Sequence, residues 1–479
     1  MGLKSRIIKG GAFLAVANIF TQILAIAVNI VLARLLLPED FGLIALATTY
    51  IGFIAIFTNI GFGSAIIYKQ TSTDVELSTL YWTNLILAIF AYLVIAGTAP
   101  MAAEFYNEPE LAKVVWLSAL TVILSPFFAI HYKIKERDLE FSLLSKITIA
   151  STTIGAVFGI AAAYYGLGVY ALVAQIISLT VVRLVLVLYF SNWNPRLLFR
   201  LREVKDMIWY SVKYQASNSI LYLERNIDYL ILGRIFPASI LGYYAFSYNI
   251  MYTPVKRISY IFSDILFPSF SALKDSPELI LSGYLQSMRL IAIVSFPVMA
   301  LLSFNAEWII LTVFGPQWNA AVPIVQILCF AGAIQSISQF GGVIFSSIGK
   351  PEVGLYVSVA RTFLVIAAII GGSAYGIVAV AYFLLIAKAI SFLLVTRVIS
   401  YFLPLSLYDL VRYLKGPVVN VAILSLIQLY VTGNGVTISL PEKLAVMFTV
   451  STIITFLIHF SILKELFVTI ISRKNVQTT

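Results

Sequence analysis

Charged residues are scarce in this chain, and their scarcity excludes a soluble globular protein. They make up 11 % of the 479 residues, whereas hydrophobic residues make up 60 %. An average soluble domain has about a quarter charged residues and under half apolar ones. The chain therefore lacks the polar surface that would cover a soluble globule of its size, and we expect it to lie in lipid.

Cysteine and histidine are nearly absent, which argues against disulfides, metal centres and redox chemistry. The single cysteine, Cys329, lies inside an apolar run and has no second thiol in the chain to pair with. The two histidines, His131 and His459, are interpreted as interfacial or packing residues. Neither a phosphate-binding loop nor a dinucleotide fingerprint occurs. We therefore expect no metal, no cofactor and no enzymatic activity, and an ATP-driven motor would need a separate subunit.

The chain has instead a series of long apolar runs, each of the length that a membrane-spanning helix needs. Helices satisfy their own backbone hydrogen bonds in lipid, and the alternating segments of a β-barrel are not seen. The first run, residues 10–36, is too long for the apolar part of a cleavable signal peptide. We expect an all-α integral membrane protein with fourteen spans, at residues 10–35, 41–66, 78–98, 112–132, 144–164, 168–190, 208–235, 240–270, 286–313, 318–347, 354–373, 375–400, 416–432 and 441–463.

Positive charges alternate between successive loops, as the positive-inside rule describes. The net charge of +10 is therefore assigned to loops beside anionic lipid, and we expect no nucleic acid partner. With an even number of spans, both termini are placed in the cytoplasm. The basic residues that set this orientation are Lys4, Arg6, Lys9, Lys69, Lys133, Lys135, Arg137, Arg196, Arg200, Arg202, Lys205, Lys274, Lys350, Arg412, Lys415, Lys464, Arg473 and Lys474.

A basic segment separates the first six spans from the others. It holds four basic residues interspersed with apolar ones, which is typical of an amphipathic segment that lies on the inner leaflet. We interpret it as a cytoplasmic connector between two lobes. The expected domains are an N-lobe at 1–190, the connector at 191–207, a C-lobe at 208–400, and two further spans with a cytoplasmic tail at 401–479.

An internal repeat supports the two-lobe interpretation. Residues 33–45 read ARLLLPEDFGLIA, and residues 233–245 read GRIFPASILGYYA. Each block joins the first helix of a lobe to the second, so we expect parallel repeats with a cavity between them. Chance similarity between apolar stretches is the alternative. The matched pairs, at an offset of 200 (234 − 34), are Arg34 and Arg234, Gly42 and Gly242, and Ala45 and Ala245.

The seventh expected span, residues 208–235, carries the richest set of polar side chains. Lys213, Glu224 and Asp228 fall near one face at helical spacing, and Arg225 lies on an adjacent stripe. Charged side chains within a membrane usually face a cavity or a partner. We interpret this helix as lining an aqueous cavity; pairing within the protein is an alternative that is compatible with it.

The other embedded charges are mostly basic, and the first lobe has no carboxylate deep in any span. A basic cavity with walls of low dielectric constant attracts anions, and phosphate suits both Arg and Lys. The predicted substrate-binding residues are Lys213, Arg225, Lys256, Arg361 and Lys388. The carboxylates predicted to couple transport to an ion are Glu224, Asp228 and Asp264.

Several stretches resemble one branch of a known transporter superfamily. Residues 34–43 read RLLLPEDFGL, residues 226–250 read NIDYLILGRIFPASILGYYAFSYNI, and residues 345–354 read FSSIGKPEVG. On these stretches the chain resembles the polysaccharide-export branch of the multidrug/oligosaccharidyl-lipid/polysaccharide superfamily. That branch comprises flippases for O-antigen, colanic-acid or teichuronic-acid precursors. The resemblance covers nearly the whole chain.

The resemblance implies two six-helix lobes arranged like a V, with two additional C-terminal helices. It implies a flippase that moves polyprenyl-pyrophosphate-linked oligosaccharides across the membrane by alternating access. The implied partners are this lipid-linked sugar, membrane lipids and polysaccharide-assembly proteins. Two other functions stay open: a cation-coupled multidrug exporter of the same superfamily, which the embedded carboxylates permit, and a membrane enzyme of glycan assembly, which the short outward loops disfavour.

Overall fold

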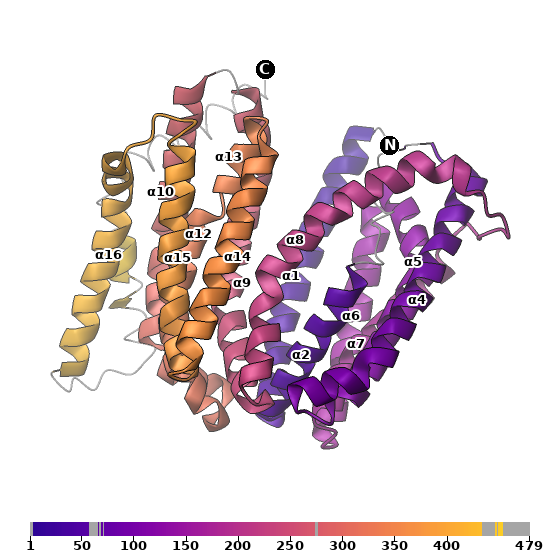
Figure 1. Ribbon diagram of the computed structural model, residues 1–479, viewed down its shortest axis with the longest axis horizontal. Helices are drawn as coiled ribbons and strands as arrows, with labels where there is room; N and C mark the ends of the chain where they lie inside the picture. Colours follow the sequence, from indigo (N-terminus) through magenta and orange to yellow (C-terminus); the bar gives the residue numbers. More distant parts are fainter. Residues whose placement is uncertain are drawn as a thin grey trace. The chain divides into compact units, whose positions relative to one another are not determined.

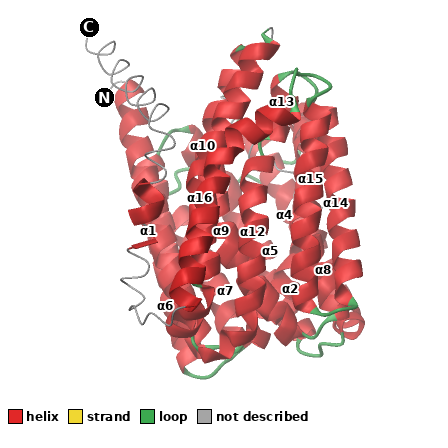
Figure 2. Cartoon of the chain, turned by 90° about the vertical axis from the view of Figure 1, so that its left-hand side faces the viewer, coloured by secondary structure: helices red, strands yellow, loops and turns green. Residues whose placement is uncertain are grey.

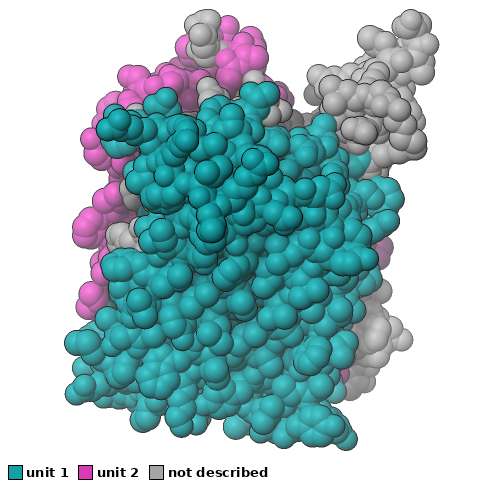
Figure 3. All heavy atoms as spheres, turned by 90° about the vertical axis from the view of Figure 1, so that its right-hand side faces the viewer, with its two compact units in different colours: residues 1–245 teal, residues 246–479 magenta. Residues whose placement is uncertain are grey.

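The computed structural model of the protein describes residues 3–56, 66, 69, 71–273, 276–433, 446, 447 and 449–453. Helices make up nearly all of this part, and no strand occurs in it (Figures 1 and 2). The contacts between residues divide the chain into two compact units, which are coloured separately in Figure 3. Unit 1 is Met1–Ala245 and unit 2 is Phe246–Thr479. The all-α membrane fold that the composition predicts is confirmed.

Unit 1 is built from long helices joined by short turns. The helix that begins at Asp74 has a capping box: the Thr73 hydroxyl accepts from the backbone N–H of Glu76 (3.3 Å), and the Glu76 carboxylate accepts from the N–H of Thr73 (3.0 Å). The described helices are α1 (Leu3–Leu35), α2 (Pro38–Ala55), α4 (Asp74–Tyr106), α5 (Leu111–Arg137), α6 (Phe141–Tyr164), α7 (Val169–Tyr189), the 3₁₀ turn η1 (Leu201–Val204), α8 (Lys205–Ile235) and α9 (Ala238–Ala272), which continues into unit 2.

Small residues bring the helices of unit 1 close together. A Cβ atom at Gly155 of α6 would lie 2.8 Å from the Leu179 Cβ of α7, and one at Gly159 would lie 2.8 Å from the Gln175 Cβ. Since lipid tails are as apolar as leucine, helices in membranes associate through such close packing rather than through the hydrophobic effect. The two glycines therefore set the spacing of the α6–α7 pair.

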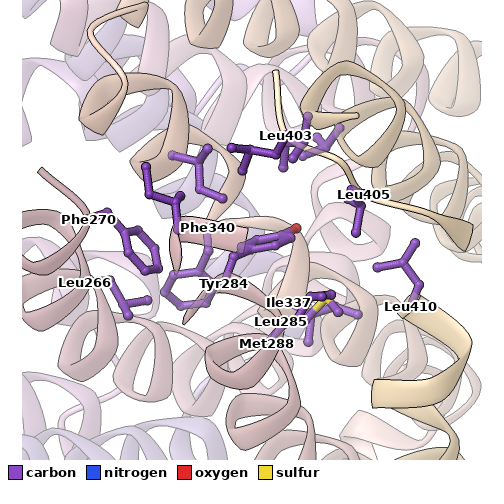
Figure 4. Packing of buried hydrophobic residues seen from close by; sticks show 14 of the residues in the cluster. Leu266, Phe270, Tyr284, Leu285, Met288, Ile337, Phe340, Leu403, Leu405 and Leu410 are labelled. Carbon is purple, nitrogen blue, oxygen red and sulfur yellow. The ribbon is translucent and has the colours of Figure 1, made fainter. Parts of the chain in front are cut away.

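Unit 2 has its own apolar core, in which α10, α12, α15 and α16 pack on one another. Tyr284, Met288 and Phe340 are fully buried at its centre (Figure 4). The described elements are α10 (Pro277–Phe304), α11 (Ala306–Ile309), the π turn η2 (Ile310–Phe314), the 3₁₀ turn η3 (Pro316–Ala321), α12 (Val322–Ser338), α13 (Gly341–Ser347), α14 (Pro351–Ser373), α15 (Ile377–Ile399) and α16 (Leu407–Gly433).

Ten helices of the described part are long and apolar enough to cross a membrane. α2, α8 and α9 occupy expected spans but are not among the ten, and in α8 the polar stripe lowers the hydropathy. The expected span at 286–313 begins too late, because α10 already starts at Pro277, a residue suited to the first turn of a helix. The last expected span, 441–463, lies largely outside the described residues. The count of fourteen is therefore approximate.

Helix α8 packs within unit 1, against α2 and α4. The expected C-lobe at 208–400 includes the same helix, because it follows the connector and opens the second repeat. Packing and repeat membership are different properties, since a helix can belong to one repeat and lie on the other. The expected domain limits stay a prediction.

Candidate transport site

A tyrosine docks helix α8 on helix α2. The Tyr222 hydroxyl donates to the Thr49 carbonyl oxygen, 3.1 Å away. A Cβ atom at Gly52, one turn further along α2, would lie 2.0 Å from the Tyr222 hydroxyl oxygen. The missing side chain at Gly52 therefore makes the room in which the phenol reaches the backbone of α2.

Asp228 is a buried carboxylate within hydrogen-bonding distance of two donors. Only 5 % of the residue is exposed. The Tyr244 hydroxyl of α9 donates to one carboxylate oxygen (2.7 Å), and the backbone N–H of Tyr229 lies 3.0 Å from the other. Tyr244 itself is fully buried. Such donors satisfy the polar atoms of a carboxylate that is buried away from water.

Two other candidates lie close to Asp228 on α8. Glu224 precedes Asp228 by one helical turn and is half-buried, whereas Arg225 is exposed. The polar side of α8 thus combines an accessible guanidinium with one half-buried and one buried carboxylate. The side chains of Lys213 in α8 and of Asp264 in α9 lie outside the described part of the structure.

The remaining basic candidates belong to unit 2. Lys256 of α9 is exposed, and Arg361 of α14 and Lys388 of α15 are half-buried. The Arg361 guanidinium lies 3.4 Å from the Ser358 hydroxyl, one turn earlier in the same helix. The described candidates therefore form two groups: Glu224, Arg225 and Asp228 in unit 1, and Lys256, Arg361 and Lys388 in unit 2.

The contacts that hold these groups in place have little signal in the sequence. Tyr222 lies on the same polar stripe as Arg225, but nothing indicates its bond to α2, and Tyr244 is one of 27 tyrosines. Glu108, in the turn between α4 and α5, lies between two expected spans, yet it binds the first residue of α9. The repeat-related glycines were identified, but not that they contact each other.

The connector is fastened to the start of α4. The backbone N–H groups of Arg196 and Arg200 donate to the Ser78 and Thr79 hydroxyls (3.0 and 3.1 Å). The Trp82 indole N–H donates to the Arg196 carbonyl (2.8 Å). Leu197, between these anchors, is 90 % exposed. The connector thus presents apolar and basic side chains outward, and its location on the inner leaflet stays a prediction.

No metal site is found in the described ranges: no three His, Cys, Asp or Glu side chains there form a group that could hold an ion.

Residues 31–323, more than half of the chain, match the family model described as "Polysaccharide biosynthesis protein". The chain belongs to the polysaccharide biosynthesis protein family.

Two well-described proteins are similar in sequence to most of the chain. The lipopolysaccharide biosynthesis protein WzxC of Escherichia coli (strain K12) is 26 % identical over 406 residues, which cover 84 % of this chain and 81 % of WzxC. The teichuronic acid biosynthesis protein TuaB of Bacillus subtilis (strain 168) is 28 % identical over 387 residues, 78 % of each chain.

Solved structures confirm the fold of this family member. The lipid II flippase MurJ, in an inward closed conformation, superposes with a TM-score of 0.75 at 12 % identity and covers 95 % of this chain and 99 % of MurJ. An inward-facing multidrug resistance MATE family transporter of the MOP superfamily gives a TM-score of 0.62 at 15 % identity, over 80 % of this chain and 95 % of the transporter. The chain is a multi-pass membrane protein with the MurJ- and MATE-like fold.

Proposed function

We propose that this protein is a flippase that moves polyprenyl-pyrophosphate-linked oligosaccharides across the bacterial cytoplasmic membrane for the assembly of surface polysaccharides. The observation that carries the proposal is the family match over residues 31–323, together with relatives named for lipopolysaccharide and teichuronic acid biosynthesis. A further relative is the succinoglycan biosynthesis transport protein ExoT of Rhizobium meliloti (strain 1021), 26 % identical over 64 % of this chain. In this proposal the protein is a transporter and not an enzyme, and both termini are cytoplasmic.

The basic candidates bind the pyrophosphate. Arg225 is exposed on α8 and Lys256 on α9, so both can reach a headgroup. Arginine and lysine form charge-assisted hydrogen bonds with phosphate oxygens, and these bonds are stronger where water is excluded. We assign Lys213, Arg361 and Lys388 to the same binding role, because they are basic residues inside expected spans. Membrane lipids surround the polyprenyl chain, and polysaccharide-assembly proteins supply and receive the sugar.

The carboxylates couple transport to an ion gradient. Asp228 is the best supported of the three, because it is buried and bonded to the hydroxyl of Tyr244. Gain or loss of a proton or cation at a buried carboxylate changes the local charge where few other groups can compensate. We assign Glu224 and Asp264 the same role, because they are carboxylates inside expected spans.

A cation-coupled multidrug exporter is the second candidate function. A buried carboxylate such as Asp228 also suits a cationic substrate, and the fold is shared with a MATE family transporter. A membrane enzyme of glycan assembly has no comparable support.

Uptake into sealed proteoliposomes separates the two transport functions. A fluorescent polyprenyl-pyrophosphate oligosaccharide is compared with a cationic dye, each with and without proton and sodium gradients. Movement of the lipid-linked sugar alone is the expected result. Movement of the dye alone would replace the flippase with the exporter.

Charge-neutralising variants test the binding residues. The double variant Lys213→Gln/Arg225→Gln should lower the initial rate of sugar transport about tenfold or more, the effect of losing two charge-assisted contacts to phosphate. The matched control is Arg412→Gln/Lys415→Gln, which removes two exposed charges from α16, outside the two six-helix lobes. Equal rates in both double variants would remove these residues from the site.

A further inference from the structure

The two glycines of the internal repeat contact each other across helices α2 and α9. A Cβ atom at Gly42 would lie 1.8 Å from the carbonyl oxygen of Ala238, and a Cβ atom at Gly242 would lie 1.7 Å from the carbonyl oxygen of Pro38. The contact is reciprocal, because Pro38 and Ala238 are also repeat-related, again 200 positions apart (238 − 38). Only glycine permits two helix backbones to approach this closely.

A carboxylate from a third segment binds the same place. The backbone N–H of Ala238, the first residue of α9, donates to the Glu108 carboxylate (2.8 Å). Glu108 lies in the turn between α4 and α5, 130 residues away in the sequence. The bond is charge-assisted, and the positive end of the helix dipole of α9 adds to it.

Two further contacts join the end of α8 to helices of the first lobe. The Arg234 guanidinium lies over the Phe105 ring of α4, 5.1 Å from its centroid. A Cβ atom at Gly233 would lie 2.8 Å from the Leu46 side chain of α2. A separate contact, the bond of the Tyr222 hydroxyl to α2, lies earlier in α8. All of these contacts fall within unit 1.

We propose that Glu108 and the Gly42–Gly242 crossing form a latch that closes the outward side of the protein and opens in each transport cycle. This inference rests on the proposed function, because an alternating-access transporter must separate its two lobes on one side and then on the other. The latch joins α8 and α9, the first two helices of the second repeat, to helices of the first repeat. It lies at the ends of these helices that the expected topology places outside the cell.

The chemistry of the latch suits repeated opening. It consists of a backbone crossing and one charge-assisted hydrogen bond, with the cation–π contact of Arg234 beside them, and water can replace each of these contacts when the helices part. A large interlocked apolar surface would instead make separation costly. Glu108 is a positioning residue in this proposal: it touches the helix end and not the transported molecule.

Cysteine labelling tests the latch without any substrate. In a Cys329→Ala background, which removes the single native thiol, the buried residue Ala238 is replaced by cysteine as a probe. A membrane-impermeant maleimide is added from outside or from inside sealed vesicles. Glu108→Ala should raise the labelling rate from outside about tenfold, the population change that the loss of one charge-assisted bond produces.

Two matched variants make this measurement decisive. Glu104→Ala removes an exposed carboxylate four residues earlier and should leave the labelling rate unchanged. Glu108→Gln keeps an acceptor oxygen and should restore most of the protection. If Glu108→Ala and Glu104→Ala label at the same rate, or if the increase occurs only from inside, the proposal is overturned.

A reversible cross-link tests the need for opening. In the same Cys329→Ala background, Glu108→Cys/Ala238→Cys is joined with a short cleavable bis-maleimide. Sugar transport should stop in the cross-linked protein and return on cleavage, and transport at the normal rate while cross-linked would refute the latch. If no sugar moves in the Cys329→Ala parent protein either, the proposed function fails, while the labelling result still decides whether the latch exists.

Discussion

The two repeat-related corners, α1–α2 and α8–α9, share a glycine crossing but cap their second helices differently. In the first corner the proline stands at position 38, and the backbone N–H of Leu37 donates to Asp40 (2.8 Å). In the second corner the proline stands one residue earlier, at position 237, and the donor is the N–H of Ala238. Because proline has no N–H, moving it by one residue moves the donor that needs an acceptor.

The acceptor changes as well. Position 240, which matches Asp40 in the repeat, is isoleucine, so the second corner has no carboxylate of its own there. Glu108 from the α4–α5 turn takes that role. The carboxylate of the first corner therefore comes from the corner itself, whereas the second corner uses one from a distant segment. The second copy of the repeat differs from the first at this position, and there a carboxylate from another segment accepts the hydrogen bond.

The largest effects are expected at the shared glycines. Gly42→Ala and Gly242→Ala should each lower the free energy of unfolding by about 1–3 kcal/mol, because the added methyl group meets a backbone carbonyl that cannot move away. Apparent melting temperatures in detergent measure this loss. Gly97→Ala in α4 is the control, since no heavy atom lies within 4 Å of its new Cβ atom. Losses of similar size at both glycines would support the symmetry of the crossing. A loss at only one of them would show that the crossing is not symmetric.

Substitution of Glu108 and substitution of Asp40 should have different effects on labelling, although both lower the stability. Glu108→Ala should cost about 1–2 kcal/mol of stability through the lost hydrogen bond to Ala238, and Asp40→Ala about 1 kcal/mol through the lost cap. Both are measured as shifts in melting temperature. Only Glu108→Ala should also raise outside labelling of the cysteine at position 238. Equal labelling in the two variants would show that the corners do not differ in function.

Exchange of the proline position should remove the need for Glu108. In Pro237→Leu/Ala238→Pro the second corner copies the first, and position 238 has no N–H to satisfy. Glu108→Ala should then cost less than about 0.5 kcal/mol, the scatter expected for independent sites. The four melting temperatures of this cycle measure the coupling. A full cost in the exchanged background would mean that Glu108 acts through another contact.

The smallest effect concerns the pH dependence of the first corner. Burial raises the pKa of Asp40 above its ordinary value of 3.8, although hydrogen bonds from the backbone of Leu37 and Val169 oppose this. A carboxyl whose pKa is raised in the folded state stabilises it when protonated. This stability is fully present below pH 3.8 and is lost as the pH rises through the folded pKa. The melting temperature of the parent protein should therefore rise relative to Asp40→Asn as the pH falls towards 3.8, and parallel curves would contradict this.

Much of the fold could be predicted because lipid imposes a simple rule. A helix must be long and apolar to cross the membrane, so run lengths located most of the helices that the structure describes. Helix α10 shows the limit of this rule: its first turns, from Pro277, carry polar residues and lie before the apolar window. Helix α8 shows another: it occupies the expected span 208–235, but its polar stripe lowers the hydropathy and it is not among the ten most apolar candidates.

The candidate site could be predicted only in part. Charged residues such as Arg225 and Asp228 stand out in an apolar helix because they are costly there. Their surroundings do not stand out: Tyr244 looks like any interfacial tyrosine until it is seen donating to Asp228. Likewise, the sequence shows that Gly52 has no side chain, but not that Tyr222 occupies the space.

Composition and the spacing of apolar runs were enough to establish a multi-pass helical membrane protein, since the cost of exposing polar backbone to lipid leaves few other folds. The repeat at an offset of 200 positions was also readable, because it is a local pattern compared with itself. The contacts of that repeat were decided by tertiary structure alone. Which carbonyl meets Gly42, and which carboxylate reaches Ala238, depends on segments more than a hundred residues apart, and no local pattern carries that information.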